Sequence, residues 1–463
     1  MADDARLDAM LACPRCDKAP LDRNSSTLKC AGCKTEFPRI AGMPWLFAEP
    51  EASLGEWRNR LHLALQTLAH EVQRLKDALG DKDLPLLARR RLELLMSATE
   101  QHRNKLRALL APIDVQSLQA AYTTHLALRT RLPGDQGLNT YYNNVHRDWC
   151  WGEAENSASV EQILGVLGAS ESHDAVLGDT VVLGAGAGRL AYDLHQLSGT
   201  AKTVAVDFNP LLLIIAQSIT RGDRIDLYEF PIAPRSLDDS AVLRTLSAPE
   251  PARDDFFLVF GDVLRPPFAT AAFDTVVTPW LIDIITEDLP SFAARVNRLL
   301  KPGGRWLNFG SLSFEQQTDR RRRYSSEEVL ELVGQAGFGP PEVREATIPY
   351  MCSPASRHGR RETVFTFCAE KLHDTTNPAR HKALPDWLVT GREPVPLLPS
   401  FQTQAMSTKI YSFIMSLIDG KRSITDMAKV LEQQQLMTRA EALPAIRNFL
   451  TRMYDDSQRQ TGF

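Results

Sequence analysis

The pattern of apolar and polar residues in the middle of the chain predicts alternating strands and helices. Residues 181–183 form a short apolar run, which indicates a buried strand, and residues 190–194 then carry apolar side chains at helical spacing. A second apolar run over residues 203–206 ends in Asp207. The order is strand, glycine-rich turn, helix, strand and acid, so we expect an α/β unit that binds a nucleotide.

The turn contains Gly184, Gly186 and Gly188. Glycine lets the backbone turn sharply and lets a ligand approach without a Cβ in its way, and an acid at the tip of the second strand can accept both hydroxyls of a ribose. A dinucleotide-binding fingerprint would place a further glycine where this chain has Arg189. The pattern G-x-G-x-G instead resembles the loop of class I methyltransferases, which implies S-adenosyl-L-methionine (SAM) as ligand. A glycine-rich turn of any α/β protein is the alternative, and Asp207 weighs against it.

Two further apolar runs predict strands that end at the same crevice. One ends in Gly261, Asp262 and Val263, and the other is FDTVVT, residues 273–278. Ligands of open α/β sheets bind at the carboxyl ends of the strands. The resemblance to class I methyltransferases implies that Asp262 meets the adenine amine, although an ordinary turn residue would look the same. Together with the glycines and Asp207, the residues expected at the cofactor are Phe208, Asp262, Val263 and Thr278.

Two stretches show no regular period. Residues 139–159 mix aromatic, polar and charged side chains, which suits a lid over a site better than a core element. A helix is expected only from residue 160 to 167. Residues 222–256 contain four prolines, and we expect an irregular insertion there.

Residues 51–138 predict a helical hairpin. Apolar residues recur at helical spacing from 61 to 79 and again from 86 to 110, with a Gly- and Pro-containing break between the two runs. We expect this hairpin to link or cover the catalytic domain. The basic run Arg89-Arg90-Arg91 fits either a solvated helix face or a contact with phosphate.

The C-terminal part has a character of its own. Prolines recur over residues 372–400, which indicates an extended linker. Residues 401–463 then place apolar side chains at helical spacing in three segments, with a helix end and an N-cap at 420–423. The pattern L-I-D-G-K-R-S-I-x-D-M-A resembles PqqD-like, winged-helix-like modules, which implies a protein or peptide partner.

Length and charge limit the possible classes of protein. The chain has 463 residues and a formal charge of −4, which suggests about two to four domains and gives no general attraction to nucleic acid. No apolar run reaches the roughly 18 residues needed to span a bilayer, and the acidic N-terminus lacks a signal-peptide pattern. We therefore expect a cytoplasmic protein with no membrane partner, and a nucleic-acid partner is not favoured.

Four of the seven cysteines form two C-x-x-C pairs, Cys13 with Cys16 and Cys30 with Cys33. Two such knuckles complete a tetrahedral Zn²⁺ site, and four thiolates leave no open position for catalysis. We expect a structural zinc. The surrounding sequence, through Phe37-Pro38 and I-A-G-M-P at 40–44, resembles the short zinc ribbons of the Trm112 type.

Several motifs between residues 139 and 371 resemble the carnosine N-methyltransferase (N2227-like) family. These are H-R-D-W at 146–149 followed by Gly152-Glu153, Ile282-Asp283, and L-L-K-P-G-G at 299–304 leading into Trp-x-Asn-x-Gly. The resemblance implies that Arg147 helps to hold SAM, and a guanidinium suits the methionine carboxylate. It also implies that Asp283 contacts the imidazole of the acceptor, where the alternative is a helix cap.

The chain also departs from that family. After the last glycine the family carries a histidine and a tyrosine, whereas this chain has Ser311-Leu312-Ser313-Phe314. A tyrosine-rich segment is replaced by S-P-A-S-R-H-G-R-R-E-T-V-F. The arginines at 321–323 and at 357, 360 and 361 fit an anionic acceptor or solvated loops. These changes affect the residues expected at the acceptor more than the residues expected at SAM.

These patterns predict an α/β protein with a Rossmann-like class I methyltransferase core, an N-terminal zinc ribbon, a helical hairpin and a small α-rich C-terminal module. The predicted divisions are 1–50, 51–138, 139–371, 372–400 and 401–463. The favoured function is SAM-dependent methylation of an imidazole nitrogen in a histidine-containing small molecule or peptide. The alternatives are a methyltransferase acting on RNA or a translation-related protein, and a non-enzymatic scaffold.

Overall fold

The computed structural model forms two compact units, residues 1–385 and 386–463. It describes residues 4–24, 27–113, 138–168, 176–197, 199–314, 318–379, 387 and 394–461, with side chains up to residue 453. Much of the predicted 372–400 linker, and the end of the predicted 51–138 hairpin region, lie outside the described residues.

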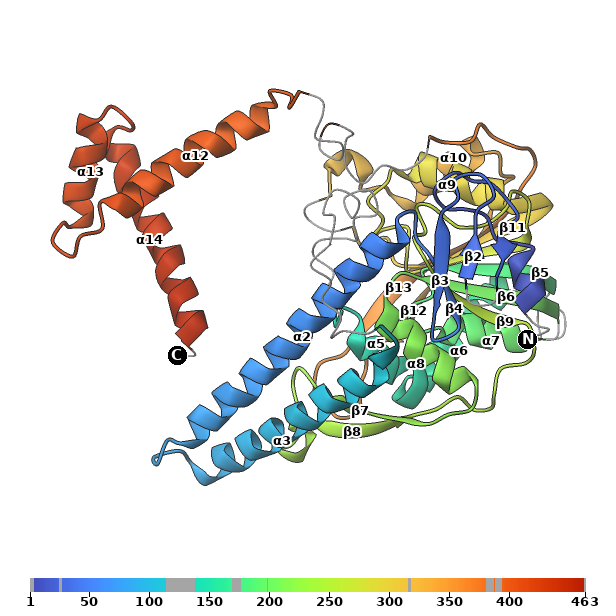
Figure 1. The fold of residues 1–463 in the computed structure, drawn as a ribbon, viewed down its shortest axis with the longest axis horizontal. Coiled ribbons are helices and arrows are strands. Elements are labelled where there is room, and N and C mark those ends of the chain that lie inside the picture. Colours follow the sequence, from blue (N-terminus) through green and yellow to red (C-terminus); the bar gives the residue numbers. More distant parts are fainter. Residues whose placement is uncertain are drawn as a thin grey trace. The chain divides into compact units, whose positions relative to one another are not determined.

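The first unit is built on an eleven-stranded sheet of order β1-β2-β3-β4-β9-β6-β5-β10-β11-β13-β12 (Figure 1). From β4 to β11 the neighbouring strands are parallel, and β13 and β12 then pair antiparallel. The apolar runs of the sequence form the central parallel strands. Such strands are buried on both faces of the sheet, so nearly all their side chains are apolar. In sheet order after β4 the strands are β9 (Phe256–Gly261), β6 (Gly199–Asp207), β5 (Val176–Leu183), β10 (Phe273–Pro279), β11 (Leu300–Gly310), β13 (Arg360–Glu370) and the edge strand β12 (Glu342–Tyr350). This is the predicted Rossmann-like class I methyltransferase fold.

Helices cover the two faces of the sheet and divide the core into two layers. Val182 and Ala205 point to one layer, whereas their neighbours Val181 and Val204 point to the other, as the two-residue period of a strand requires. The first layer includes α6 (Glu153–Val166), α7 (Arg189–Gln196) and α8 (Pro210–Thr220). The second includes α9 (Leu289–Leu299) and α10 (Ser326–Gln335).

The cysteine-containing N-terminal segment extends this sheet. Its strand β4 (Met43–Leu46) pairs in parallel with the end of β9, with Trp45 opposite Phe260. The rings of these two residues are 5.0 Å apart. The segment thus covers an edge strand that would otherwise present unpaired backbone groups. Its remaining elements are α1 (Asp4–Asp8), β1 (Asp22–Arg23), β2 (Thr27–Lys29) and β3 (Glu36–Ile40).

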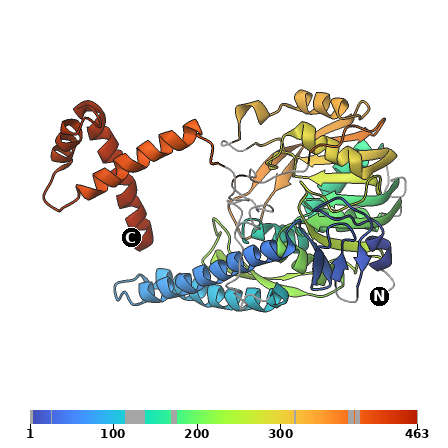
Figure 2. The same cartoon turned by 45° about the horizontal axis from the view of Figure 1, so that its top comes forward.

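Two long antiparallel helices, α2 (Pro50–Leu79) and α3 (Leu86–Leu109), form a hairpin that extends away from the sheet (Figure 2). Trp57 of α2 is fully buried, so the base of the hairpin packs on the core. Arg89 donates to the carbonyl oxygens of Leu79 and Asp81, which caps the end of α2. Arg90 forms an ion pair with Asp238. Arg89 therefore holds the hairpin together, and Arg90 links it to the insertion at 222–256. A short η1 turn (Ala111–Ile113) follows.

Two stretches expected to be irregular contain regular elements. The prediction was wrong for residues 139–159 and held only in part for 222–256, whose four prolines lie outside its strands. Residues 139–159 contain α5 (Tyr142–His146), the π-helix η3 (Arg147–Trp151) and the start of α6 at Glu153. Mixed polarity misled the prediction because the segment packs on several sides. The insertion at 222–256 holds an antiparallel pair, β7 (Ile225–Glu229) and β8 (Val242–Leu246), with the short helix η4 (Asp238–Ser240) between them. Another short helix, η5 (Arg320–Arg322), precedes α10.

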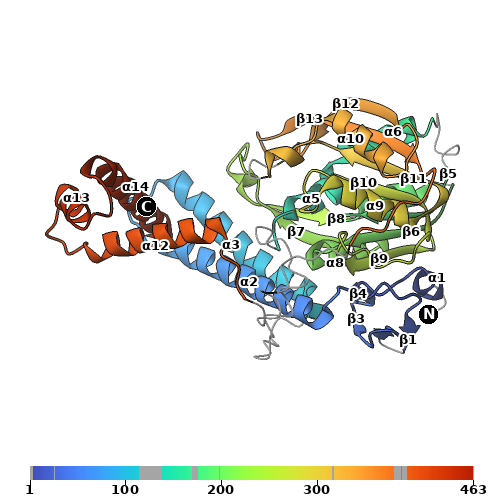
Figure 3. The same ribbon diagram turned by 90° about the horizontal axis from the view of Figure 1, so that it is seen from above.

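Between residues 394 and 461, the described part of the second unit forms the helices that the three apolar segments predicted (Figure 3). They are α12 (Pro399–Ser416), α13 (Ile424–Gln433) and α14 (Arg439–Thr461). Ser423 caps α13 and forms a capping box with Asp426. A small core includes Ile414, Leu431 and Ile446. Among the helices that the structure describes in either unit, none has the length and apolar character that a membrane crossing needs.

Candidate active site

A cavity of about 330 Å³ lies at the carboxyl ends of the parallel strands. Residues after β5, β6, β10 and β11 contribute to its wall, as expected for a ligand site in an open α/β sheet. Helices α5 and α6 and the ends of β12 and β13 complete the wall. Of the residues predicted from sequence, the lining includes Arg147, Gly184, Gly186, Asp207, Phe208, Val263 and Asp283.

The glycine-rich loop uses conformations that favour glycine. Gly184, Gly186 and Gly188 have φ angles of 72°, 59° and 84°, which lie in the left-handed region. A Cβ on Gly186 would meet no atom within 4 Å, so the backbone here faces open space in the cavity. Gly188 instead begins α7, and a Cβ there would lie 3.2 Å from Ala216. Gly184 and Gly186 form the cavity wall, and Gly188 packs the helix behind it.

Asp207 closes this end of the cavity. Its carboxylate accepts the backbone N–H of Gly186 and that of Asn209, both at 2.8 Å. The residue is 6 % exposed, and burial raises the pKa of Asp207 to about 6 despite these bonds. The carboxylate is thus fixed at the tip of β6, the position from which an acid can accept ribose hydroxyls.

Arg147 enters the cavity from the π-helix η3, a turn type that recurs at functional sites. Its Nε donates to Asp148 Oδ1 at 2.7 Å and its Nη1 donates to Glu155 Oε1 at 3.0 Å. Burial by itself would lower the pKa of Arg147, but the charges of the two carboxylates outweigh it and raise the pKa. Among the described residues Nη2 has no hydrogen-bond partner, so this atom is left to meet a ligand.

Gly152 and Glu155 fix the position of Arg147. A Cβ on Gly152 would lie 2.3 Å from the carbonyl oxygen of Arg147 and 2.6 Å from its Cγ. No side chain fits there unless Arg147 moves. Glu155 uses its second oxygen to accept the backbone N–H of Met351 at 2.8 Å. Arg147 is therefore tied through Glu155 to the end of β12.

Asp283 lies on the segment that follows β10. It is 6 % exposed, and its Oδ2 accepts the hydroxyl of Ser311 at 3.1 Å and the backbone N–H of Ser313 at 2.9 Å. Oδ1 is not used by these two donors. Burial raises the pKa of Asp283. The helix cap considered for this residue is provided instead by Asp288, which accepts the N–H of Ser291 at the start of α9.

Asp262 and Thr278, like Gly188, are not among the residues that line the cavity. The Asp262 carboxylate accepts the N–H of Leu264 in a tight turn, so the neighbouring Val263 faces the cavity instead. Thr278 is fully buried; its hydroxyl donates to Asn308 and accepts from Trp306 Nε1. The Trp-x-Asn-x-Gly motif is thus part of the sheet interior, and the geometry gives no support to a cofactor contact by Thr278.

Sequence reasoning did not single out several residues that line the cavity. Glu155, Trp280 and Tyr350 are the clearest cases. Trp280 and Tyr350 have ring centroids 4.9 Å apart and form an aromatic wall beside Asp283. The stretch around Trp280 gave a signal, since it directly precedes Ile282-Asp283. Neither Glu155 nor Tyr350 belongs to a local motif that would identify it.

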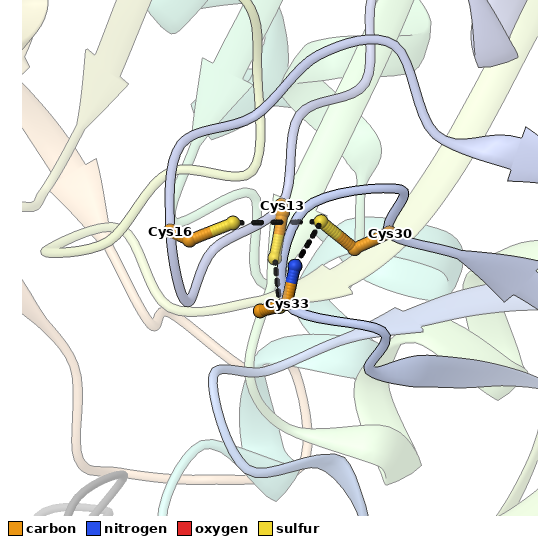
Figure 4. A group of neighbouring side chains, drawn as sticks. All are labelled: Cys13, Cys16, Cys30 and Cys33. Atoms are coloured by element: carbon orange, nitrogen blue, oxygen red, sulfur yellow. Dashed lines mark hydrogen bonds between the residues drawn. The ribbon is translucent and has the colours of Figure 1, made fainter.

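The four paired cysteines come together in the N-terminal segment (Figure 4). Their Sγ atoms all lie within 4.8 Å of one another, with Cys13 and Cys33 3.5 Å apart and Cys16 and Cys30 3.4 Å apart. Sulfur atoms around a tetrahedral Zn²⁺ are separated by about 3.8 Å, given a Zn–S bond of about 2.3 Å. The donor set and its spacing fit a structural zinc.

Comparison with known proteins places this core among methyltransferases. The family model described as carnosine N-methyltransferase matches residues 136–367. This chain belongs to the carnosine N-methyltransferase family. Carnosine N-methyltransferase of Dictyostelium discoideum is 27% identical over 184 residues, which is 35% of this chain and 38% of that protein. The enzyme of that name from Rattus norvegicus is 26% identical over 211 residues, 42% of this chain and 52% of that protein.

Among solved structures, phosphoethanolamine N-methyltransferase 2 of Haemonchus contortus, in complex with S-adenosylhomocysteine, aligns with a TM-score of 0.33 at 14% identity. That alignment covers 52% of this chain and 61% of the other. A complex of the Haloferax volcanii Trm112 methyltransferase activator with a methyltransferase gives a TM-score of 0.30 at 15% identity, over 50% of this chain and 98% of the other.

Proposed function

We propose that this protein is a SAM-dependent N-methyltransferase that methylates an imidazole nitrogen of a histidine-containing small molecule or peptide. The observation that carries the proposal is the single cavity in which Arg147, Gly186 and Asp207 face Asp283. Membership of the carnosine N-methyltransferase family supports the same reaction. The relatives supply the substrate class only by analogy, since this chain matches about half or less of their length.

The residues at one end of the cavity fit SAM. The open space at Gly186 accommodates a ligand close to the backbone, and the Asp207 carboxylate suits the ribose hydroxyls. The Nη2 amino group of Arg147 is available to donate to the methionine carboxylate of SAM. SAM supplies the methyl group when it is bound.

Asp283 is proposed to orient the acceptor. A carboxylate that accepts the N–H of a neutral imidazole leaves the lone pair of the other ring nitrogen free for the methyl group. The same carboxylate stabilises the positive charge that develops on the ring as the methyl is transferred. Because the neutral ring already has a lone pair, no strong base is required, and the N–H proton leaves the product ring afterwards.

The direct test is methyl transfer from labelled SAM, followed by mass spectrometry, with histidine, carnosine, histidine-containing peptides and cell extract as acceptors. We expect the label on an imidazole nitrogen, and its loss in Asp283→Asn. Label found only in RNA or extract protein would overturn the imidazole assignment. Failure to bind SAM at all would contradict the assignment as a methyltransferase and favour a non-enzymatic scaffold.

We infer in addition that the four cysteines hold one structural Zn²⁺ in a Trm112-like ribbon. The thiolates would add to the buried side chains of Leu11, Leu28 and Phe37 in stabilising this small segment. Elemental analysis by mass spectrometry should find one zinc per chain, lost in Cys30→Ser together with part of the thermal stability. Cys150→Ser is the matched control, because Cys150 is exposed and is not one of these four. A zinc content unchanged in Cys30→Ser would contradict the site.

The three-helix C-terminal unit is proposed to be a PqqD-like recognition module. The capping box at Ser423 and the helix order support this comparison only in outline. Binding of a histidine-containing peptide that weakens when residues 394–463 are deleted would support it, and unchanged binding would contradict it.

A further inference from the structure

The buried ionic groups around Arg147 carry a surplus of negative charge. Arg147 and Arg189 supply two positive charges, whereas Asp148, Glu155 and Asp193 supply three negative ones. The side chains of all five are at most 16 % exposed, so solvent ions screen their charges only weakly. Burial is the main cause that raises the pKa of Asp193 to about 6; nearby carboxylates act in the same direction, and Arg189 opposes them. A bound cation would compensate this surplus.

Asp193 faces the cavity and keeps acceptor sites for a ligand. It lies on α7 three residues after Leu190, a spacing that puts both on one helix face, and both line the cavity. Its two oxygens accept the same N–H, that of Arg189 Nε, at 2.8 and 2.9 Å. A carboxylate offers about four lone-pair sites. Within the described part of the chain no other donor bonds this carboxylate, so sites on both oxygens are left for a ligand.

The other two carboxylates beside Arg147 are already engaged. Glu155 accepts from Arg147 with one oxygen and from a backbone N–H with the other. Asp148 accepts from Arg147 Nε, and its side chain is 5 % exposed, against 16 % for Asp193. The guanidinium of Arg189 donates to Asp193 and also to the carbonyl oxygen of Asp148, at 2.9 Å. Asp193 is therefore fixed relative to the helical turn that carries Arg147.

We propose that Asp193 binds the α-ammonium group of SAM while Arg147 binds the carboxylate on the same carbon. An ammonium group has three donors and no acceptor, and it is stable in a buried site only when it is paired and hydrogen-bonded. Arg189 is then a positioning residue, because it holds Asp193 on one side and the backbone of Asp148 on the other. The assignment rests on the proposed function and adds to it a residue that recognises the amino-acid end of the cofactor.

The test compares three ligands by calorimetry on the full-length protein. They are S-adenosylhomocysteine, its analogue with hydrogen in place of the α-amino group, and 5′-methylthioadenosine, which lacks the whole amino-acid end. We expect the natural protein to bind the deaminated analogue about ten- to 100-fold more weakly than S-adenosylhomocysteine, the range for a buried hydrogen bond between charged groups. In Asp193→Asn this difference should shrink to about threefold or less, since the amide is neutral. The Kd of 5′-methylthioadenosine should stay unchanged, which also shows that the variant is folded.

Glu153→Gln is the matched control. Glu153 bonds the same guanidinium, at 3.1 Å, but its side chain is 74 % exposed and is not among those that line the cavity. This variant should keep the preference for the amino group.

Equal binding of S-adenosylhomocysteine and its deaminated analogue by the natural protein would overturn the inference and leave the proposed function standing. A preference that survives in Asp193→Asn, or that is lost equally in Glu153→Gln, would also overturn it, because the effect would then come from other groups or only through Arg189. Failure of all three ligands to bind the natural protein would contradict the proposed function, and this inference with it.

Discussion

The two ends of the cavity are built in different ways. The end proposed for SAM relies on a local unit, in which Gly184, Gly186 and Asp207 lie within a stretch of 24 residues. Backbone conformation makes most of that wall. The end proposed for the acceptor is made of side chains from distant elements, including Asp283 after β10, Tyr350 on β12 and Arg360 on β13.

The difference suggests how such a site can keep its cofactor and change its acceptor. The glycines tolerate few replacements, because all three have positive φ angles and because a Cβ on Gly184 would also lie 3.0 Å from Leu281. Tyr350 and Arg360 are side chains on a strand pair, so they can be exchanged without altering the fold. Arg147 is the link between the two ends, since Glu155 connects it to the backbone of Met351.

The largest expected effect lies at the acceptor end. Asp283→Asn should lower kcat/KM for an imidazole acceptor about 100-fold, because the negative charge that stabilises the forming imidazolium is removed. The affinity for SAM, measured by calorimetry, should stay within a factor of two, roughly the error of such comparisons. If SAM binding fell as far as the activity, the two ends would not be separable as described.

Acidification should affect both ends. The acceptor must be neutral, and imidazole has a pKa of about 6.5, so kcat/KM should fall about tenfold between pH 7.5 and pH 5.5. Burial raises the pKa of Asp207 to about 6. Below that value the carboxyl is protonated and accepts fewer hydrogen bonds, so SAM affinity should also fall. A rate that stays constant down to pH 5 would argue against an imidazole acceptor.

A smaller effect is expected from Gly152→Ala, which probes the cofactor end through Arg147. The added methyl group would collide with the carbonyl oxygen and Cγ of Arg147 and displace the guanidinium. We expect SAM to bind about tenfold more weakly, the size of one lost charged hydrogen bond. Acceptor affinity should change less. Isothermal titration with SAM and then with the acceptor measures both.

Gly334→Ala is the control for that substitution, because Gly334 lies inside α10 and a Cβ there meets no atom within 4 Å. It should leave SAM affinity unchanged and raise the melting temperature slightly, as alanine favours a helix over glycine. Equal SAM affinity in Gly152→Ala and the natural protein would show that Arg147 needs no such fixed position.

Much of the fold followed from local patterns. The apolar runs at 181–183 and 203–206 are strands, and the hairpin break near residue 80 is a turn, because periodicity and glycine or proline placement act over a few residues. The stretch at 139–159 was misjudged. It contains the π-helix that carries Arg147, and its composition gives no period to detect.

The sequence by itself determined the elements whose cause is local: the glycine loop with Asp207, the two cysteine knuckles, and the motif that carries Asp283. Tertiary structure alone decided which residues meet across the sheet. In the folded protein Thr278 lies in the sheet interior and Glu155 contacts Arg147. Strand β4 pairs with β9, and Arg360 lies over the ring of Tyr350 at the cavity. The contacts of Thr278 and of β4 join residues 30 or more positions apart, and those of Arg147 and Arg360 join separate elements. No local pattern encodes such contacts, because only the packing of the sheet and its helices fixes where these side chains lie.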